Sequence, residues 1–204
     1  MKERLAILVI KLIKQLELFR RKLEKDGTSA GIYKRKFIKK YGIDPEKKIV
    51  SESLKVGKIL DVGCGGGKFP KDAIGIDPRP KGVKGLHGGQ SGVPSKADVV
   101  GYAENLPFTP RSFDTIIFRH SFEHVSDPVL VLNEVKRILR GKGIGIFIIP
   151  DDSSVDTINL DRSHKHVYTP ESFRRLVEAV GGFEIIGNII TVPEWSFGCV
   201  VCKK

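Results

Sequence analysis

The stretch that decides the fold is ILDVGCGGGKF, residues 59–69, in which a short apolar run precedes an aspartate and alternating glycines. A second acidic residue, Asp77, lies sixteen positions after Asp61. A strand that ends in a glycine-rich turn presents backbone N–H groups to a ligand, and an acid at the end of the next strand can bind a ribose diol. The stretch therefore predicts a pocket for a nucleotide-like ligand.

The glycine spacing narrows the choice of ligand. The dinucleotide pattern G-x-G-x-x-G, read from Gly63, needs glycine where this chain has Lys68, which disfavours an NAD-linked reductase. The pattern D-x-G-x-G-x-G fits from Asp61 to Gly67 and resembles motif I of the class I S-adenosylmethionine-dependent methyltransferases. The resemblance implies that the methionine end of the cofactor contacts Asp61, Gly63, Cys64 and Gly65, and that Asp77 binds the ribose hydroxyls.

Further segments occur in the order of the type 11 methyltransferases, which act on small molecules. They are YAENLPF at 102–108, SFDTIIF at 112–118, FEHVSDP at 122–128 and the helix-like NEVKRILRGKG at 133–143. This resemblance covers residues 57–204 and implies that Ala103 and Glu104 lie near the adenine. It also implies that Arg119 lies beside the methionine carboxylate or at the sulfonium-facing edge. The family usually has an aspartate before the alanine, where this chain has Tyr102.

These motifs predict an α/β fold: a Rossmann-like, doubly wound, mostly parallel sheet with an antiparallel C-terminal strand. Strands are expected at 73–77, 98–101, 112–118, 144–149, 183–190 and 196–202, in addition to the one before Gly63. Helices are expected after the N-cap residues Ser126 and Thr169. Only residues 68–72 connect the first two strands, whereas a parallel crossover usually needs at least about 10 residues, so the first helix is expected to be curtailed.

The basic charge is concentrated at the N-terminus. Residues 1–50 hold 15 Lys/Arg against 6 Asp/Glu, a charge of +9, out of +11 for the chain. Apolar residues from Leu5 to Leu23 recur every three or four positions, which predicts an amphipathic helix, and a second basic cluster occupies residues 33–41. We expect a helical extension over 1–50 and a methyltransferase domain over 51–204. The basic faces are interpreted as solvated, with RNA backbone and an anionic membrane surface as alternative contacts.

The same region shows neither a signal peptide nor an apolar run of the length that spans a bilayer. Three cysteines leave one unpaired in any disulfide scheme, which suits a reducing compartment and predicts a cytoplasmic protein. The spacing Cys199-Val-Val-Cys202 lies in an apolar run without a second cysteine pair, so zinc binding there is disfavoured. The oligomeric state is left open.

Histidines supply the candidates for a catalytic proton acceptor, because their ordinary pKa lies near neutrality. His120 follows the expected fourth strand, where the family's substrate pocket opens, and His166 precedes Tyr168. The alternative is that these histidines have structural roles, since many family members need no base. Asp161, His164 and His166 are of metal-ligating types, but no metal is assigned.

The predicted function is therefore methyl transfer from S-adenosylmethionine to a small-molecule or lipid-like acceptor. An RNA methyltransferase that uses the basic N-terminal helices is one alternative, although the N-P-P-Y signature of exocyclic-amine methylation is absent after the fourth strand. A cofactor-binding regulatory protein without transferase activity is the other, favoured by Tyr102 and the curtailed helix.

Overall fold

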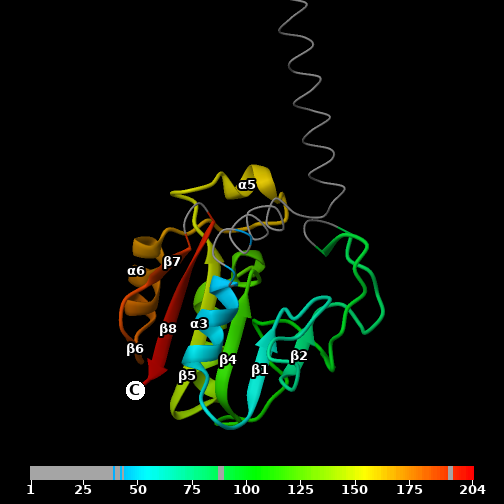
Figure 1. Cartoon of the computed structure of the whole chain (residues 1–204). Helices are drawn as coiled ribbons and strands as arrows, with labels where there is room; N and C mark the ends of the chain where they lie inside the picture. The colour runs from blue at the N-terminus through cyan, green and yellow to red at the C-terminus, as the bar shows by residue number, and fades with distance from the viewer. Residues whose placement is uncertain (1–38, 40–41, 43, 87–89, 193–194) are drawn as a thin grey trace, which may run out of the picture.

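The computed structural model describes residues 39, 42, 44–86, 90–192 and 195–204 (Figure 1). The predicted amphipathic N-terminal helix lies outside these residues, as does nearly all of the basic cluster at 33–41. Within the described ranges, no helix combines the length and the apolar character needed to span a bilayer.

One eight-stranded sheet forms the centre of the fold, with the strand order β3-β2-β1-β4-β5-β8-β6 and with β7 also paired to β8. The first five strands are parallel, and β8 runs antiparallel to β5, β6 and β7. This arrangement confirms the predicted Rossmann-like fold with an antiparallel C-terminal strand. The strands are β1 (Ile59–Val62), β2 (Ile74–Asp77), β3 (Val99–Val100), β4 (Phe113–Arg119), β5 (Leu139–Pro150), β6 (Phe183–Ile185), β7 (Ile190–Val192) and β8 (Ser196–Lys203).

Helices cover both faces of the sheet. On one face, α4 (Pro128–Ile138) and α6 (Pro170–Val180) pack their apolar sides against the strands, and on the other α3 (Pro45–Ser53) crosses β4 and β5 (Figure 1). Strand β5 serves both cores, because Ile144, Ile146 and Ile148 point to the α3 side while Phe147 and Ile149 point to the other. This alternation is the period of two that a doubly covered strand requires.

The helix starts follow ordinary capping chemistry. Thr169 caps α6 in a reciprocal capping box with Ser172, as its sequence predicts. The predicted cap Ser126 is wrong for α4: the side chain of Asp127 accepts from the Leu130 N–H over 2.9 Å. Asp127 directly precedes Pro128 at the first helical position, and proline there leaves the preceding residue extended, as an N-cap must be.

Two predicted strands differ from the observed ones. The strand predicted at 144–149 begins earlier, at Leu139, because Leu139 pairs with Phe113 across an irregular register before the regular ladder from Ile144. The strand predicted at 183–190 is divided into β6 and β7, with Gly187 between them at φ +66°. A positive φ interrupts the extended backbone, so a continuous strand cannot pass through this glycine.

No helix connects β1 to β2, which confirms that the first helix is curtailed. The chain instead turns through Gly67, whose N–H donates to the Cys64 carbonyl, and Phe69, whose N–H donates to the Asp61 side chain over 2.9 Å. We call residues 63–67 the glycine turn. Its N–H groups lie at the carboxyl ends of β1 and β2 without a helix behind them.

Helix α3 brings part of the predicted N-terminal extension onto the sheet. Asp44 caps it by accepting from the Lys47 N–H, and Ile49 and Val50 are buried against β4 and β5. The expected boundary between residues 50 and 51 thus falls inside this helix. The division into an extension and a domain otherwise remains a prediction.

Candidate functional site

The glycine turn is closely packed at two of its glycines. Gly63 has φ +73°, and a Cβ there would lie 2.4 Å from the Ser121 Cβ; Gly65 has φ +51°, and a Cβ there would lie 2.5 Å from the Gln90 Oε1. Gly63 thus combines a left-handed backbone with a lack of space, which only glycine satisfies. Gly65 has the same backbone conformation, and the group beside it is the end of the flexible Gln90 side chain. The third glycine of the pattern, Gly67, has open space around it.

Asp77, the predicted ribose-binding acid, lies buried at the end of β2 and contacts the glycine turn. Its Oδ2 accepts from the Gly65 N–H over 2.9 Å. Arg79 binds the same carboxylate, with 3.0 Å from its Nε to Oδ1 and a further bond from its own N–H. The structure therefore brings Asp77 and the glycine turn together, and it adds Arg79, which the motif did not indicate.

Asp61 is buried below the turn, and burial raises the pKa of its carboxyl to about 6. The hydrogen bond from Phe69 and the positive charges of Arg119 and Lys68 lower that pKa but do not cancel the effect of burial. Arg119, at the end of β4, also places its guanidinium 5.8 Å from the centre of the Phe69 ring. Arg119 is thus close enough to Asp61 to affect its pKa, and the contacts of both residues with the methionine end remain a prediction. Burial likewise raises the pKa of the Cys64 thiol to about 12, so that this side chain stays neutral.

Residues 82–86 and 90–95, which we call the covering segment, fold over the glycine turn. Gln90 Oε1 accepts from the Gly66 N–H over 2.9 Å, and the Val93 side chain fills the space where a Cβ at Gly66 would lie. The Lys96 N–H then donates to the Gly65 carbonyl. Sequence reasoning missed these contacts because the segment is rich in glycine, proline and lysine and is typical of a plain loop.

The loop at 102–108, predicted to lie near the adenine, is fixed by a side-chain hydrogen bond and by packing against the core. Glu104 Oε1 accepts from the Ser126 N–H over 2.6 Å, so its side chain is already engaged. Ala103 packs against the core, whereas Tyr102 is exposed. With the Glu104 side chain engaged, a contact between the adenine and the backbone of Ala103 and Glu104 remains a prediction.

His120 follows β4 in a left-handed conformation with φ +51°. Its Nε2 lies 2.7 Å from Oε1 of the buried Glu46, and the same oxygen accepts from Trp195 Nε1 and Ser196 Oγ. Burial lowers the pKa of His120, but the adjacent Glu46 carboxylate outweighs burial and the pKa is raised overall. Sequence reasoning missed Glu46 and Trp195, which are far from His120 in the chain and belong to no motif.

The second predicted catalytic histidine, His166, has one long side-chain contact among the described residues: its Nε2 lies 3.4 Å from the Ser126 carbonyl at an exposed position.

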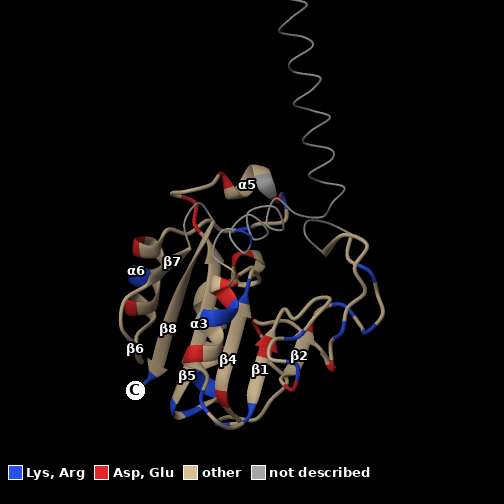
Figure 2. Ribbon diagram, viewed as in Figure 1, with Lys and Arg blue, Asp and Glu red and all other residues tan. Residues whose placement is uncertain are grey.

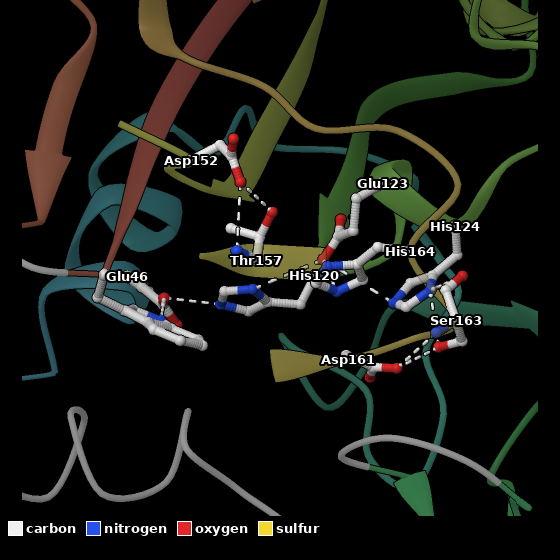
Figure 3. Close-up of polar contacts among 10 residues, drawn as sticks. Glu46, His120, Glu123, His124, Asp152, Thr157, Asp161, Ser163 and His164 are labelled. Atoms are coloured by element: carbon white, nitrogen blue, oxygen red, sulfur yellow. Dashed lines mark hydrogen bonds and ion pairs between the residues drawn. The ribbon is translucent and has the colours of Figure 1, made fainter. Parts of the chain in front are cut away.

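Neighbouring His164 is instead directed inwards, beside His124 and the buried Glu123 (Figure 3). Burial lowers the pKa of His164, and His124 adds to that effect. The Asp161 carboxylate accepts hydrogen bonds from the N–H and the hydroxyl of Ser163, over 2.9 and 2.6 Å.

Figure 2 shows Lys and Arg interspersed with Asp and Glu over the described ribbon. This mixture matches the sequence, in which residues 51–204 hold 20 Lys/Arg against 18 Asp/Glu. A surface of mixed charge does not favour a polyanionic partner for this part of the chain.

A nucleoside with a carboxylate-bearing tail fits the residues at the carboxyl ends of β1, β2 and β4. The turn supplies glycines without room for a Cβ, Asp77 supplies a buried acid one strand away, and Arg119 supplies a positive charge. Arg79 now binds the Asp77 carboxylate, and Gln90 now binds the Gly66 N–H. A ligand that binds both groups must replace these two hydrogen bonds.

Comparison with known proteins agrees with this geometry. The methyltransferase domain family matches residues 60–147. A ubiquinone biosynthesis O-methyltransferase of Aeromonas salmonicida is 33% identical over 95 residues, which cover 42% of this chain and 40% of that protein. An uncharacterized methyltransferase, YcgJ, of Bacillus subtilis is 30% identical over 119 residues, which cover 54% of this chain and 46% of that protein. The match thus spans less than half the length of these relatives.

Solved structures share the fold. The S-adenosylmethionine-dependent methyltransferase of Aquifex aeolicus aligns with a TM-score of 0.59 at 20% identity, covering 79% of this chain and 90% of that one. The structure of Bacillus subtilis YcgJ aligns with a TM-score of 0.55 at 18% identity, covering 77% and 96%. Residues 60–147 therefore match the methyltransferase domain family, and the chain shares the fold of solved S-adenosylmethionine-dependent methyltransferases.

Proposed function

We propose that this chain is an S-adenosylmethionine-dependent methyltransferase that acts on a small-molecule or lipid-like acceptor. The observation that carries the proposal is the bond between the Gly65 N–H and Asp77 Oδ2, which joins the glycine turn to a buried acid at the end of the adjacent strand. Two parallel strands that end at the same edge of a sheet form the usual crevice for a nucleotide-like ligand.

In this proposal Asp77 holds the ribose, the glycine turn and Asp61 lie against the methionine end, and the 102–108 loop lies against the adenine. Arg119 offers a positive charge for the methionine carboxylate. The cofactor, when bound, supplies an electrophilic methyl group on a sulfonium. The protein's own contribution is to orient the acceptor, exclude water and receive a proton where the acceptor is a hydroxyl.

A hydroxyl acceptor is supported by the O-methyltransferase names of several relatives. His120 is the proposed proton acceptor, because it follows β4 at the edge of the sheet where the glycine turn lies. Its Nε2 is held by Glu46, so in this proposal the proton is received by Nδ1, the ring nitrogen that lies 3.8 Å from Glu123 Oε1. His166 is the less supported candidate, since a single bond of 3.4 Å holds its ring.

Isothermal titration calorimetry with S-adenosylmethionine and with its demethylated product tests the cofactor assignment. We expect the intact chain to bind both ligands and Asp77→Asn to bind them at least about tenfold more weakly, because the amide is a poorer acceptor than the carboxylate. Asp72→Asn is the matched control, since Asp72 is an exposed acid just before β2. Equal binding by the two variants, or none by the intact chain, would contradict the proposal. A labelled-methyl screen of phenols and lipid alcohols then tests the acceptor class.

A second candidate is a cofactor-binding protein without transferase activity. The observation in its favour is that Arg79 and Gln90 already bind the Asp77 carboxylate and the Gly66 N–H. Cofactor binding without product formation across the acceptor screen would favour it. Turnover of any acceptor would exclude it.

An RNA methyltransferase is the third candidate, favoured by the charge of +9 on residues 1–50. Binding to tRNA that weakens steeply with salt and is lost on deletion of residues 1–38 would support it. Equal binding with and without those residues would remove its main support.

A further inference from the structure

Glu123 is a buried carboxylate whose side chain forms no hydrogen bond within the described part of the chain. The side chain is 2% exposed, and neither of its oxygens has a hydrogen-bond partner among the described residues. An unsatisfied buried charge strongly destabilises a folded protein, so native proteins normally pair such groups or bind a metal with them. The position of Glu123 thus calls for a cationic partner.

Three imidazole nitrogens surround this carboxylate (Figure 3). Oε1 of Glu123 lies 3.8 Å from His164 Nε2, 3.9 Å from His124 Nε2 and 3.8 Å from His120 Nδ1. These separations are too long for hydrogen bonds. They approach the spacing of roughly 3.3 Å between two ligand atoms that share a tetrahedral zinc ion with bonds of about 2.0–2.1 Å.

The outer ring nitrogens of His124 and His120 are engaged in the manner of metal ligands, whereas His164 Nδ1 is buried without a hydrogen-bond partner among the described residues. His124 Nδ1 lies 3.1 Å from the Ser163 carbonyl and 3.2 Å from the Ser163 hydroxyl, and Nε2 lies on the side of Glu123. Donation from Nδ1 to the carbonyl, which can only accept, leaves Nε2 available as a metal ligand. A ligating histidine commonly donates its other ring N–H to a carbonyl or carboxylate, which fixes its tautomer and orientation. His120 shows the same pattern, because its Nε2 is bonded to Glu46.

The backbone fixes the relative position of the two segments that carry these side chains. Glu123 and His124 belong to the short 3-10 helix η2 (Phe122–His124), and His164 lies in the loop after the short helix α5 (Thr157–Leu160). The Lys165 and His166 N–H groups both donate to the Glu123 carbonyl, over 2.9 and 3.1 Å. These main-chain hydrogen bonds therefore fix the loop that carries His164 beside Glu123.

We propose that Glu123, His124 and His164 bind a divalent transition metal ion, with zinc as the preferred ion. Their ligand atoms lie within 4.8 Å of one another, and two imidazoles with one carboxylate form a ligand set that zinc commonly occupies. Three protein ligands leave a fourth position for water or for an oxygen of a bound molecule, and His120 Nδ1 lies 3.8 Å from Glu123 Oε1. Metal binding itself does not depend on the proposed methyl transfer.

Metal titration of the full chain tests this proposal. After dialysis against a chelator and then against buffer, the protein is titrated with zinc sulfate in a calorimeter, and zinc content is measured by mass spectrometry after gel filtration. We expect one zinc ion per chain, a higher thermal midpoint with zinc, and at least tenfold weaker binding for Glu123→Gln and for His164→Ala. Cobalt(II) in place of zinc should give the visible absorption of a four-coordinate ion, lost in both variants.

Two control variants separate this site from others on the chain. His166→Ala removes an imidazole from the same loop, and Cys202→Ser removes the partly exposed thiol; both should bind zinc as the unaltered protein does. Glu123→Gln keeps the shape of the side chain and removes a buried charge, so it should unfold no earlier than the unaltered protein in chelator. Absence of zinc binding by the unaltered chain, or equal binding by folded Glu123→Gln, would overturn the proposal.

Discussion

The guanidinium of Arg137 binds the carboxylate of Glu134 through two bonds of 2.6 and 2.7 Å, one turn along α4. The same guanidinium donates to the carbonyls of Phe108 and Leu106, and Glu134 in turn accepts from the Leu106 N–H. An ion pair on one helix therefore holds the loop at 102–108, which the proposed function places against the adenine.

Arg137→Ala is expected to lower the free energy of unfolding by about 1–3 kcal/mol, because it removes the donor to two carbonyls and the ion-pair partner of Glu134. It should also weaken cofactor binding by loosening the loop. Chemical denaturation and calorimetry measure the two effects. Arg175→Ala is the control, since Arg175 pairs with Glu171 on the exposed face of α6 and should change stability by less than about 0.5 kcal/mol. Equal effects of the two substitutions would contradict this prediction.

Asp61→Asn is expected to stabilise the protein at neutral pH. The folded pKa is about 6 against an ordinary value of 3.8, so the folded state binds the proton more tightly than the unfolded state does. The carboxylate then costs stability progressively as pH rises from about 4 to 6, reaching about 3 kcal/mol above that range. The free energy of unfolding of the variant minus that of the unaltered protein should grow across this window, as measured by denaturation from pH 4 to 8. A difference independent of pH would be inconsistent with a raised pKa.

The same substitution is expected to weaken cofactor binding, because Asp61 lies beside Arg119 and beneath the glycine turn. A gain in stability together with a loss of affinity is the usual signature of a residue kept for binding rather than for folding. Calorimetry on the variant at pH 7 measures the affinity.

Gly63→Ala is expected to lower the free energy of unfolding by about 2–3 kcal/mol. A methyl group there meets the Ser121 Cβ at 2.4 Å, and φ of +73° disfavours any side chain. Gly67→Ala, in the same turn, has no atom within 4 Å of the added Cβ and should be nearly neutral. Thermal and chemical denaturation distinguish the two; similar losses would show that the turn tolerates neither.

Glu46→Ala is expected to lower the free energy of unfolding by about 3 kcal/mol, because its Oε1 receives bonds from His120, Trp195 and Ser196. Glu46→Gln keeps a side-chain oxygen and should recover part of that loss. Trp195 fluorescence reports the local change, since its indole N–H loses an acceptor. An unchanged free energy of unfolding in the alanine variant would show that these bonds are replaced by water.

Local patterns predicted the parts of the fold that depend on neighbours in the chain. The apolar runs placed the strands, the glycine spacing placed the turn, and the short path from Lys68 to Asp72 predicted the curtailed helix. The split of the strand at Gly187 was missed because a single glycine in a strand-like run does not fix the sign of φ.

The candidate site was predictable only where a motif contained the residue. Asp61, Asp77 and Arg119 belong to motifs, and the structure places them at one edge of the sheet. Gln90 and Glu46 reach the site from segments without a pattern, and their contacts span 24 and 74 positions of chain. Such long-range contacts depend on the assembled fold, which a short stretch of sequence does not encode.

The path of α3 also decides where this protein can be shortened for expression. A cut at residue 50, the boundary that charge composition suggests, would remove Glu46, Ile49 and Val50, and with them the acceptor of His120 and part of one core. A shortened chain that begins at or before Asp44 keeps the helix cap and these three side chains. The usable fragment is therefore several residues longer than the methyltransferase motifs alone would indicate.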